Sequence, residues 1–271
     1  MNFYTRLEQA ISTDDIPTKT EITAECLAYY NQNEIRENKD FIPKIFSQPS
    51  YFNRCQIVAQ KDLRHRKDFD TDEGLAVLVH SIAHIEYSAI DLALDAVYRY
   101  RNMPKQYTID WLDVASDEIR HFKMLETLLH ELGFAYGNFP VYSGLFDAGN
   151  NTRENILDRM AIVPRYFEAS GLDVGPQIVK KLANKHKIPN VKKLIDILEI
   201  IYEEEIDHVL KGDRWFKYLC EKEGKEVSVY FEILERYRLL EKHRPHLNAK
   251  GRKEAGFSCD EILKLGAKDC E

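Results

Sequence analysis

Hydrophobic residues recur every three or four positions along four long stretches of the chain, and this spacing predicts four amphipathic helices. The stretches cover residues 72–101, 105–132, 152–170 and 190–222. Each apolar stripe contains one glutamate, whereas a surface glutamate would lie on the opposite side of the helix. These glutamates are Glu86, Glu118, Glu168 and Glu205. The pattern therefore predicts four helices that each carry a carboxylate on the face turned toward the core.

Local signals place the ends of these helices. A short polar side chain can accept the first free amides of a helix, so Thr71 or Asp72 is expected to cap the first stretch and Thr152 the third. Glycine ends helices and proline interrupts them, so the third helix is expected to kink within its length and to stop at its glycine. The residues concerned are Gly133 after the second helix, and Pro164 and Gly171 in the third.

The remaining segments complete an all-α prediction. Shorter helices are expected at 3–11, 18–30, 175–186, 225–241 and 259–265, and irregular structure at 31–71. The first two long helices are joined by a very short connection and are therefore antiparallel neighbours, whereas 134–151 forms a long crossover. The expected parts are a helical and irregular wrap at 1–71, a four-helix bundle at 72–222 and a helical extension at 223–271, all in one compact domain.

Composition supports helix and limits the function classes. The 271 residues include only 12 Gly and 9 Pro, and 44% are hydrophobic, which is enough to bury a core. The net charge of −7 disfavours broad nucleic-acid binding, which needs a basic face. The N-terminus lacks the apolar core of a signal peptide, and no run of about 18 apolar residues occurs. The chain is predicted to be soluble, cytoplasmic and not membrane-associated.

Cysteine usage agrees with a reducing compartment. The five cysteines are odd in number and scattered, and no Cys-x-x-Cys motif occurs. They are Cys26, Cys55, Cys220, Cys259 and Cys270. Buried or incidental thiols are therefore expected, and not a disulfide framework.

Two of the four glutamates belong to Glu-x-x-His motifs, Glu118 with His121 and Glu205 with His208. Residues three apart on a helix lie about 60° apart around its axis and one turn apart along it, so both side chains can reach one metal ion. In chain order the candidates run Glu, Glu-x-x-His, Glu, Glu-x-x-His, which is the ligand set of carboxylate-bridged two-metal centres in four-helix bundles. Four carboxylates are costly to bury unless cations neutralise them, and two divalent ions would do so.

The donor set indicates the metals. Carboxylate and imidazole groups suit iron, with manganese, a mixed Fe/Mn pair and zinc as alternatives, and the lack of thiolate ligands disfavours an iron–sulfur cluster. A single Glu-x-x-His motif carries little weight, because nine His among abundant Glu produce such pairs by chance. The core-facing glutamates carry the prediction of two metal ions. The alternative is that the core-facing side of these helices is assigned wrongly, so that the glutamates point to solvent.

Polar residues beside the candidate ligands have two interpretations each. Asp117, Glu204 and Asp207 could orient a ligand histidine through its second ring nitrogen, or they could be helix-surface charge. Arg165 and Tyr202 lie one turn before ligand glutamates. Arg165 could pair with that carboxylate, whereas Tyr202 could hydrogen-bond it or act as a redox-active phenol, although core packing is favoured.

Two further features allow a binding role. His80 and His84 share a helix face and could form a second metal site, but Glu86 lies about 200° around the helix from His84, so a structural role is favoured. The basic segments Arg64–Lys67 and Arg238–Lys253 have aromatic residues nearby and could contact RNA. A solvated charged surface is the favoured interpretation of both segments.

Long stretches around the candidate ligands resemble a known family. They are HSIAHIEYSAIDLALDAVYR, ASDEIRHFKMLETLLHELGFAYGNFP, MAIVPRYFEASGLDV, EEEIDHVLKGDRWFKYLC and AGFS. Through them most of the chain resembles the bacterial ferritin-like family catalogued as domain of unknown function 455, and more distantly the ferritin-like hydroxylase that modifies tRNA adenosine side chains. The resemblance implies a ferritin-like four-helix bundle with extra helices at both termini. It supports six metal ligands, Glu86, Glu118, His121, Glu168, Glu205 and His208.

These observations predict a dimetal carboxylate protein, with two iron ions favoured, that acts as an O2-dependent oxidoreductase on a small molecule or a nucleoside. The sharper form of this hypothesis is hydroxylation of a modified nucleoside in RNA. One alternative is a ferroxidase or iron-handling protein, although the segments 1–71 and 223–271 would hinder packing into a simple cage. Another is a non-catalytic helical scaffold whose ligand set is vestigial or binds zinc.

Overall fold

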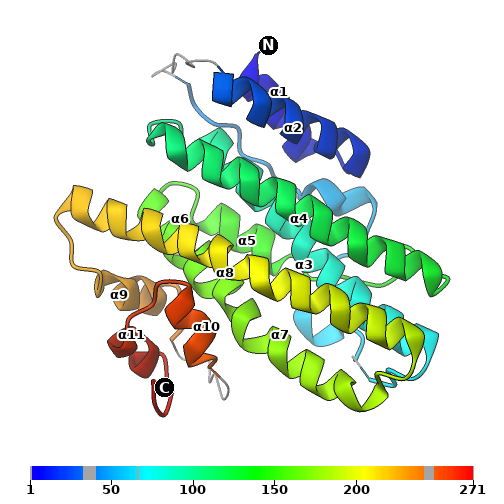
Figure 1. Ribbon diagram of the computed structural model, residues 1–271. Coiled ribbons are helices and arrows are strands. Elements are labelled where there is room, and N and C mark those ends of the chain that lie inside the picture. The colour runs from blue at the N-terminus through cyan, green and yellow to red at the C-terminus, as the bar shows by residue number, and fades with distance from the viewer. Residues whose placement is uncertain (1, 33–40, 66, 241–246, 271) are drawn as a thin grey trace. The chain divides into compact units, whose positions relative to one another are not determined.

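The computed structural model describes residues 2–32, 41–65, 67–240 and 247–270. Helices dominate this part of the chain, and no strand occurs in it (Figure 1). The predicted all-α fold is confirmed. The chain divides into two compact units, residues 1–150 with 185–197 and residues 151–184 with 198–271. The expected division into wrap, bundle and extension stays a prediction.

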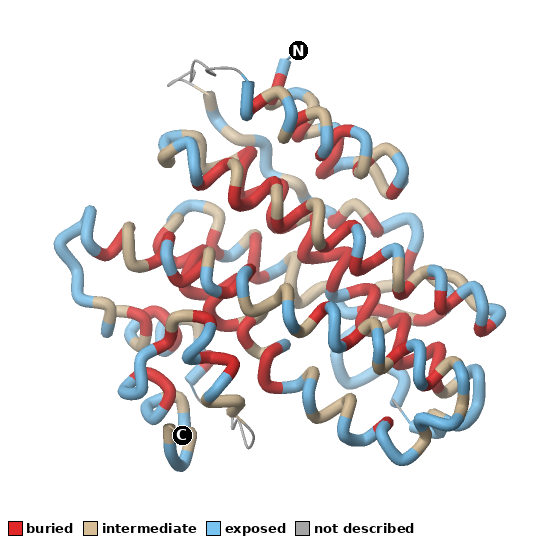
Figure 2. Tube along the Cα trace, viewed as in Figure 1, coloured by how far each residue is buried: buried red, intermediate tan, exposed pale blue. Residues whose placement is uncertain are grey.

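Two long helices form the centre of the first unit. α3 (Asp72–Arg99) and α4 (Lys105–Glu131) are joined by a short turn and pack along each other (Figure 1). Their apolar stripes are buried (Figure 2). The Thr71 hydroxyl accepts a hydrogen bond from the Gly74 N–H at 3.1 Å and caps α3, and Gly133 has a φ of 83° just after α4. The predicted bounds of both helices are confirmed to within a few residues.

α3 also has the length and hydropathy of a membrane span, and it is the one such helix in the described part of the chain. Of its most apolar window, 83% is buried inside the protein. A helix that is apolar on most sides is either a membrane span or a core helix, and burial of this extent is what a core helix shows. The cytoplasmic location stays a prediction.

Shorter helices complete the first unit. They are α1 (Phe3–Ser12), α2 (Ile16–Gln32), α5 (Gly144–Asn151) and 3-10 turns at Ser50–Asn53 and Gln60–Asp62. α1 packs on α2 and α3, and α2 packs on α4. α2 begins earlier than predicted because Pro17 is tolerated in a first turn, where its missing N–H has no partner to lose. α5 lies within 134–151, and the expectation that this stretch forms the crossover stays a prediction.

The third long stretch differs most from expectation. It consists of α6 (Ile156–Ile162), a π-helical turn at Val163–Glu168, here called the π segment, and α7 (Ala169–Leu182). Asn155 caps α6, since its side chain accepts from the N–H groups of Leu157 and Asp158. Thr152 is not the cap, because its buried hydroxyl accepts from Arg159 Nε at 3.0 Å. The helix continues through Gly171, which does not adopt the left-handed φ that ends helices.

The described residues of the C-terminal part form one long and three short helices. They are α8 (Pro189–Glu223), which continues from the first unit into the second, followed by α9 (Val229–Arg236), α10 (Ala249–Glu254) and α11 (Cys259–Lys264). α8 and α11 are confirmed, α9 is shorter than predicted, and α10 was not predicted. Cys259 and Cys270 form a disulfide, so the expectation of unpaired thiols is wrong for this pair. The other three cysteines are buried free thiols.

Candidate metal centre

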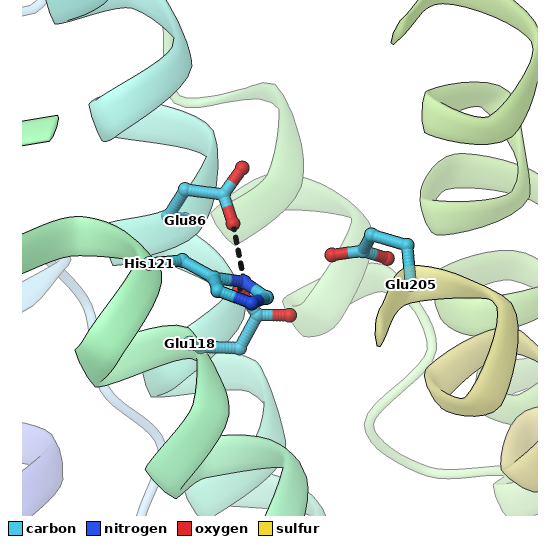
Figure 3. A group of neighbouring side chains, drawn as sticks. All are labelled: Glu86, Glu118, His121 and Glu205. Atoms are coloured by element: carbon cyan, nitrogen blue, oxygen red, sulfur yellow. Dashed lines mark hydrogen bonds and ion pairs between the residues drawn. The ribbon is translucent and has the colours of Figure 1, made fainter. Parts of the chain in front are cut away.

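Three predicted ligands come together in the first unit. Glu86 on α3 and Glu118 and His121 on α4 each offer a ligand atom, and these atoms lie within 4.8 Å of one another. Glu118 and His121 are fully buried, and the Glu86 side chain is 6% exposed. His121 Nδ1 lies 3.2 Å from Glu86 Oε2, along the dashed line in Figure 3, and 3.4 Å from Glu118 Oε2. These three residues are called the first half-site.

The charge of the first half-site favours a cation. Burial raises the pKa of Glu86, and the neighbouring Glu118 carboxylate raises it further. Burial lowers the pKa of His121, but its hydrogen bonds to Glu118 and Glu86 and their charges outweigh this and raise it. In the described part of the chain, neither lysine nor arginine pairs with Glu86. A proton or a metal ion would neutralise the buried Glu86 carboxylate.

The other three predicted ligands lie in the second unit. On α8, His208 Nδ1 is 3.7 Å from Glu205 Oε1, and these side chains are 1% and 12% exposed. Glu205 Oε2 is buried and accepts no hydrogen bond from the described residues. Glu168 is the last residue of the π segment, and its Oε2 is also buried. These three residues are called the second half-site.

The π segment and α8 approach each other unusually closely. A Cβ atom added to Gly212 would lie 2.2 Å from Pro164 Cβ and 2.5 Å from Pro164 Cγ, which no side chain could accept. Gly212 lies one turn after His208, and Pro164 lies one turn before Glu168. The missing side chain at Gly212 thus lets the segment that carries Glu168 lie against the helix that carries the other two ligands.

The π segment itself has a local cause. Proline has no N–H and its ring pushes against the preceding turn, so a regular helix cannot continue unchanged through Pro164. The chain responds with a wider turn, in which the Ala169 N–H bonds the Pro164 carbonyl. The structure has a π turn where the sequence predicted a kink at Pro164. Single π turns within α-helices occur frequently at functional sites, and this one ends on a candidate ligand.

One group of side chains in the described residues could hold a metal ion. Within the first unit it comprises Glu86, Glu118 and His121 (Figure 3). Oxygen donors with one imidazole nitrogen suit iron, manganese or zinc. Three of the six predicted ligands thus belong to the first unit, and the other three, Glu168, Glu205 and His208, belong to the second.

The residues predicted to support the ligands have other partners. Asp117 pairs with Arg120 at 2.8 Å and Asp207 pairs with Lys211 at 2.7 Å, as helix-surface charges do. The Tyr202 hydroxyl accepts from Asn248 Nδ2 at 2.8 Å. The role of Glu204, which is half-buried on α8, stays a prediction.

Arg165 does not pair with Glu168. Its guanidinium is fully buried and pairs with Asp213 and Glu261. Its interactions with these carboxylates and with three aromatic rings direct the guanidinium away from Glu168, which lies one turn along the helix. Sequence spacing could not reveal this, because both acids are distant along the chain.

The basic segments remain candidates for RNA contact by prediction alone. Arg64 pairs with Glu73 at 2.6 Å, and its guanidinium lies 5.3 Å from the Phe139 ring centroid. Arg66 and residues 241–246 lie outside the described residues.

His80 and His84 hold a loop to α3. His84 Nε2 lies 3.0 Å from the Tyr142 carbonyl and so donates to it, which leaves Nδ1 to accept from the Tyr136 hydroxyl at 2.9 Å. His80 Nε2 accepts from the Gly137 N–H at 2.9 Å. Both rings are therefore neutral in the folded protein, and the favoured structural role agrees with these contacts.

Acid is expected to destabilise the protein through these histidines. Burial lowers the pKa of each from 6.5 to about 4, so their contribution to stability is present above pH 6.5 and is lost as pH falls toward 4. Between pH 7 and pH 5 the free energy of unfolding is expected to fall by about 2 kcal/mol for each histidine. Urea unfolding of His84→Gln at both pH values should show a smaller fall than wild type, whereas His130→Gln, at an exposed position on α4, should not. An equal fall in both variants would contradict this assignment.

Sequence comparison finds a matching protein family and a relative that covers most of the chain. A family model described as "Protein of unknown function (DUF455)" matches residues 12–263. An uncharacterized protein of Haemophilus influenzae is 35% identical over 274 residues, which cover 96% of this chain and 92% of the relative. No solved structure matches the chain. Neither description names an activity, so chemistry has to be argued from the candidate site.

Proposed function

The chain belongs to the DUF455 family of unknown function, and from its site we propose that it is a ferritin-like dimetal carboxylate protein that uses O2 to oxidise a substrate. In this proposal the first and second half-sites lie in one four-helix bundle and together bind two ions. Iron is the favoured metal, with manganese, a mixed Fe/Mn pair or zinc as alternatives. His121 would hold one ion and His208 the other, and the four glutamates would supply the remaining protein ligands.

The observation that carries the proposal is the burial of Glu86 and Glu118 beside His121. Burial and the Glu118 charge both raise the pKa of Glu86, so an ionised Glu86 in the core costs several kcal/mol unless a cation compensates it. Such an arrangement makes physical sense when a cation binds. Glu205 Oε2, buried without a hydrogen bond from the described residues, fits the same donor set.

The chain's own residues would bind and orient the metals and exclude water from them. A bound pair of redox-active ions would supply the chemistry of O2 reduction and substrate oxidation. The apolar stripes of α3 and α4 around the first half-site keep its surroundings dry, which strengthens the charge interactions there. A small molecule or a nucleoside is the proposed substrate class. RNA as the carrier of that nucleoside is not favoured by the net charge of −7.

Metal loading tests the proposal. Wild-type protein titrated anaerobically with Fe²⁺ is expected to bind two equivalents and to develop a diferric absorbance band when O2 is added. Glu118→Ala and Glu205→Ala are expected to lose at least one equivalent and the band. Asp117→Ala and Asp207→Ala, which change surface acids beside the same ligands, are matched controls and should load normally.

The same titration separates the alternatives. Fewer than two equivalents in the wild type would sink the dimetal proposal. O2 consumption beyond the iron added, in the presence of cell extract or RNA, would favour an oxygenase. Consumption limited to the added iron would favour a ferroxidase.

A further inference from the structure

The π segment contains a backbone carbonyl that helix geometry alone does not satisfy. The Ala169 N–H bonds the Pro164 carbonyl, and four-residue spacing resumes in α7. Because the hydrogen-bond spacing changes from five residues to four at this point, no backbone N–H of the helix is placed to bond the carbonyl of Arg165. The hydroxyl of Tyr230 on α9 donates to that oxygen at 3.0 Å, and both residues are fully buried. Tyr230 therefore completes the backbone hydrogen bonding of the π segment.

Arg252 on α10 holds the residues that follow Glu168. Its fully buried guanidinium donates to both carboxylate oxygens of Asp173, at 2.9 Å from Nε and 2.6 Å from Nη2. Nη2 also donates to the carbonyl of Ala169, the next residue after Glu168, at 3.2 Å. A planar guanidinium that binds a carboxylate and a carbonyl together fixes the orientation of the first turn of α7.

Arg165 fastens the residues that precede Glu168. Its Nη2 donates to Glu261 Oε1 at 2.7 Å and lies 2.9 Å from Asp213 Oδ1. The guanidinium carbon lies 4.4 to 4.6 Å from the centroids of three aromatic rings, within the range of cation–π attraction. The rings are those of Phe216, Tyr230 and Phe257. Glu261 and Phe257 belong to the C-terminal segment, so that segment holds Arg165 by charge and by packing.

We infer that this C-terminal segment is a positioning part of the metal site. The C-terminal clamp is defined as Tyr230, Arg252, Phe257 and Glu261. Its members bind groups at positions 165, 169 and 173, which bracket Glu168 in the sequence. The clamp does not touch metal; it holds the π segment in the register that directs Glu168 into the second half-site. The inference rests on the proposed function of that half-site.

The clamp matters because a π turn is equivalent to one extra residue in an α-helix. If the π segment relaxed to regular α-helix, the residues on one side of it would rotate by about 100° relative to the other. Glu168 is the last residue of the π segment, so this rotation would point its carboxylate in a different direction relative to α6. Outer-sphere partners that fix ligand orientation typically change metal affinity by about 10- to 100-fold.

Replacing Tyr230 by phenylalanine tests the clamp. The substitution removes the hydroxyl and keeps the ring that packs on Arg165. Titration with Co²⁺, followed by absorbance and calorimetry, is expected to show one of two sites weakened by about 10-fold or more and the other unchanged. Hydrogen exchange of metal-free protein is expected to accelerate in peptides that cover residues 163–171.

Tyr237→Phe is the matched control. The Tyr237 hydroxyl lies in the same part of the chain and bonds Asp158 Oδ2 at 3.0 Å and the Asn151 carbonyl at 3.3 Å, ahead of the π segment. It should retain wild-type Co²⁺ affinity and wild-type exchange at 163–171.

The outcomes separate the clamp from the proposed function. Two bound ions in wild type with unchanged affinity in Tyr230→Phe would overturn the clamp alone. Equal weakening in both tyrosine variants would indicate general destabilisation and would also overturn it. Fewer than two ions in the wild type would overturn the proposed function, and the role of the clamp at the metal site would fall with it.

Discussion

Replacing Glu86 by leucine is expected to stabilise the metal-free protein and to remove the stabilisation that metal at the first half-site provides. Glu86 is 6% exposed, and burial and the Glu118 charge raise its pKa, so its ionised form opposes folding. Leucine has a similar volume and extends the apolar stripe of α3 without that cost. Urea unfolding at pH 8 is expected to show a gain of about 1–4 kcal/mol in the free energy of unfolding.

The gain has a defined pH dependence. A carboxyl group whose pKa is higher in the folded than in the unfolded protein destabilises the folded state at pH values above its unfolded pKa. For Glu86 the unfolded pKa is 4.5. The Glu86 contribution to stability therefore becomes less favourable as pH rises from 4.5 toward the raised pKa, and the advantage of Glu86→Leu should shrink from pH 8 to pH 4. Metal at 1,000 times its dissociation constant should stabilise wild type by about 4 kcal/mol for each bound ion, and the variant should lack the share of the ion at the first half-site, so the order of stability is expected to reverse.

Glu73→Leu is the control for this substitution. Glu73 lies in the first turn of the same helix, and its side chain is 59% exposed. This variant should gain no stability and should keep the response to metal. A metal-free Glu86→Leu protein less stable than wild type would mean that the buried carboxylate is already compensated, and the argument for a cation at the first half-site would fail.

The long helices and Glu86 could be predicted because their signals are local. A buried stripe at three- and four-residue spacing fixes which face of a helix turns inward, and Val79, Ala83 and Ile90 are all buried around Glu86 as expected. Thr71 caps α3 because its side chain needs only the amide three residues ahead. Ligands spaced along such helices are therefore visible in the sequence.

Several details of the third stretch could not be predicted because contacts beyond helical spacing override its local signals. Thr152 has the chemistry of a cap but is buried against Arg159, so Asn155 takes that role. The path of the π segment depends on Gly212, which lies on another helix. The partners of Arg165 likewise come from far along the chain, so helical spacing suggested a nearer and incorrect one.

Replacing Arg165 by methionine is expected to be the most destabilising single change in the second unit. Arg165 is fully buried, and its removal leaves the carboxylates of Asp213 and Glu261 in the core without that cation. Breaking a buried pair in this way typically costs about 3–5 kcal/mol in the free energy of unfolding, measured by urea titration. Arg120→Met, which breaks the exposed pair with Asp117, should cost less than about 1 kcal/mol.

Two additional measurements separate charge from packing in this cluster. Burial raises the pKa of Asp213 and the Arg165 charge lowers it, so in Arg165→Met the carboxyl should take up a proton more readily and the loss should be smaller at pH 5 than at pH 8. A triple variant that adds Asp213→Asn and Glu261→Gln should recover much of the stability, because no uncompensated charge remains. If it stays as unstable as Arg165→Met, the packing of the guanidinium among its three aromatic rings, and not its charge, holds the π segment in place.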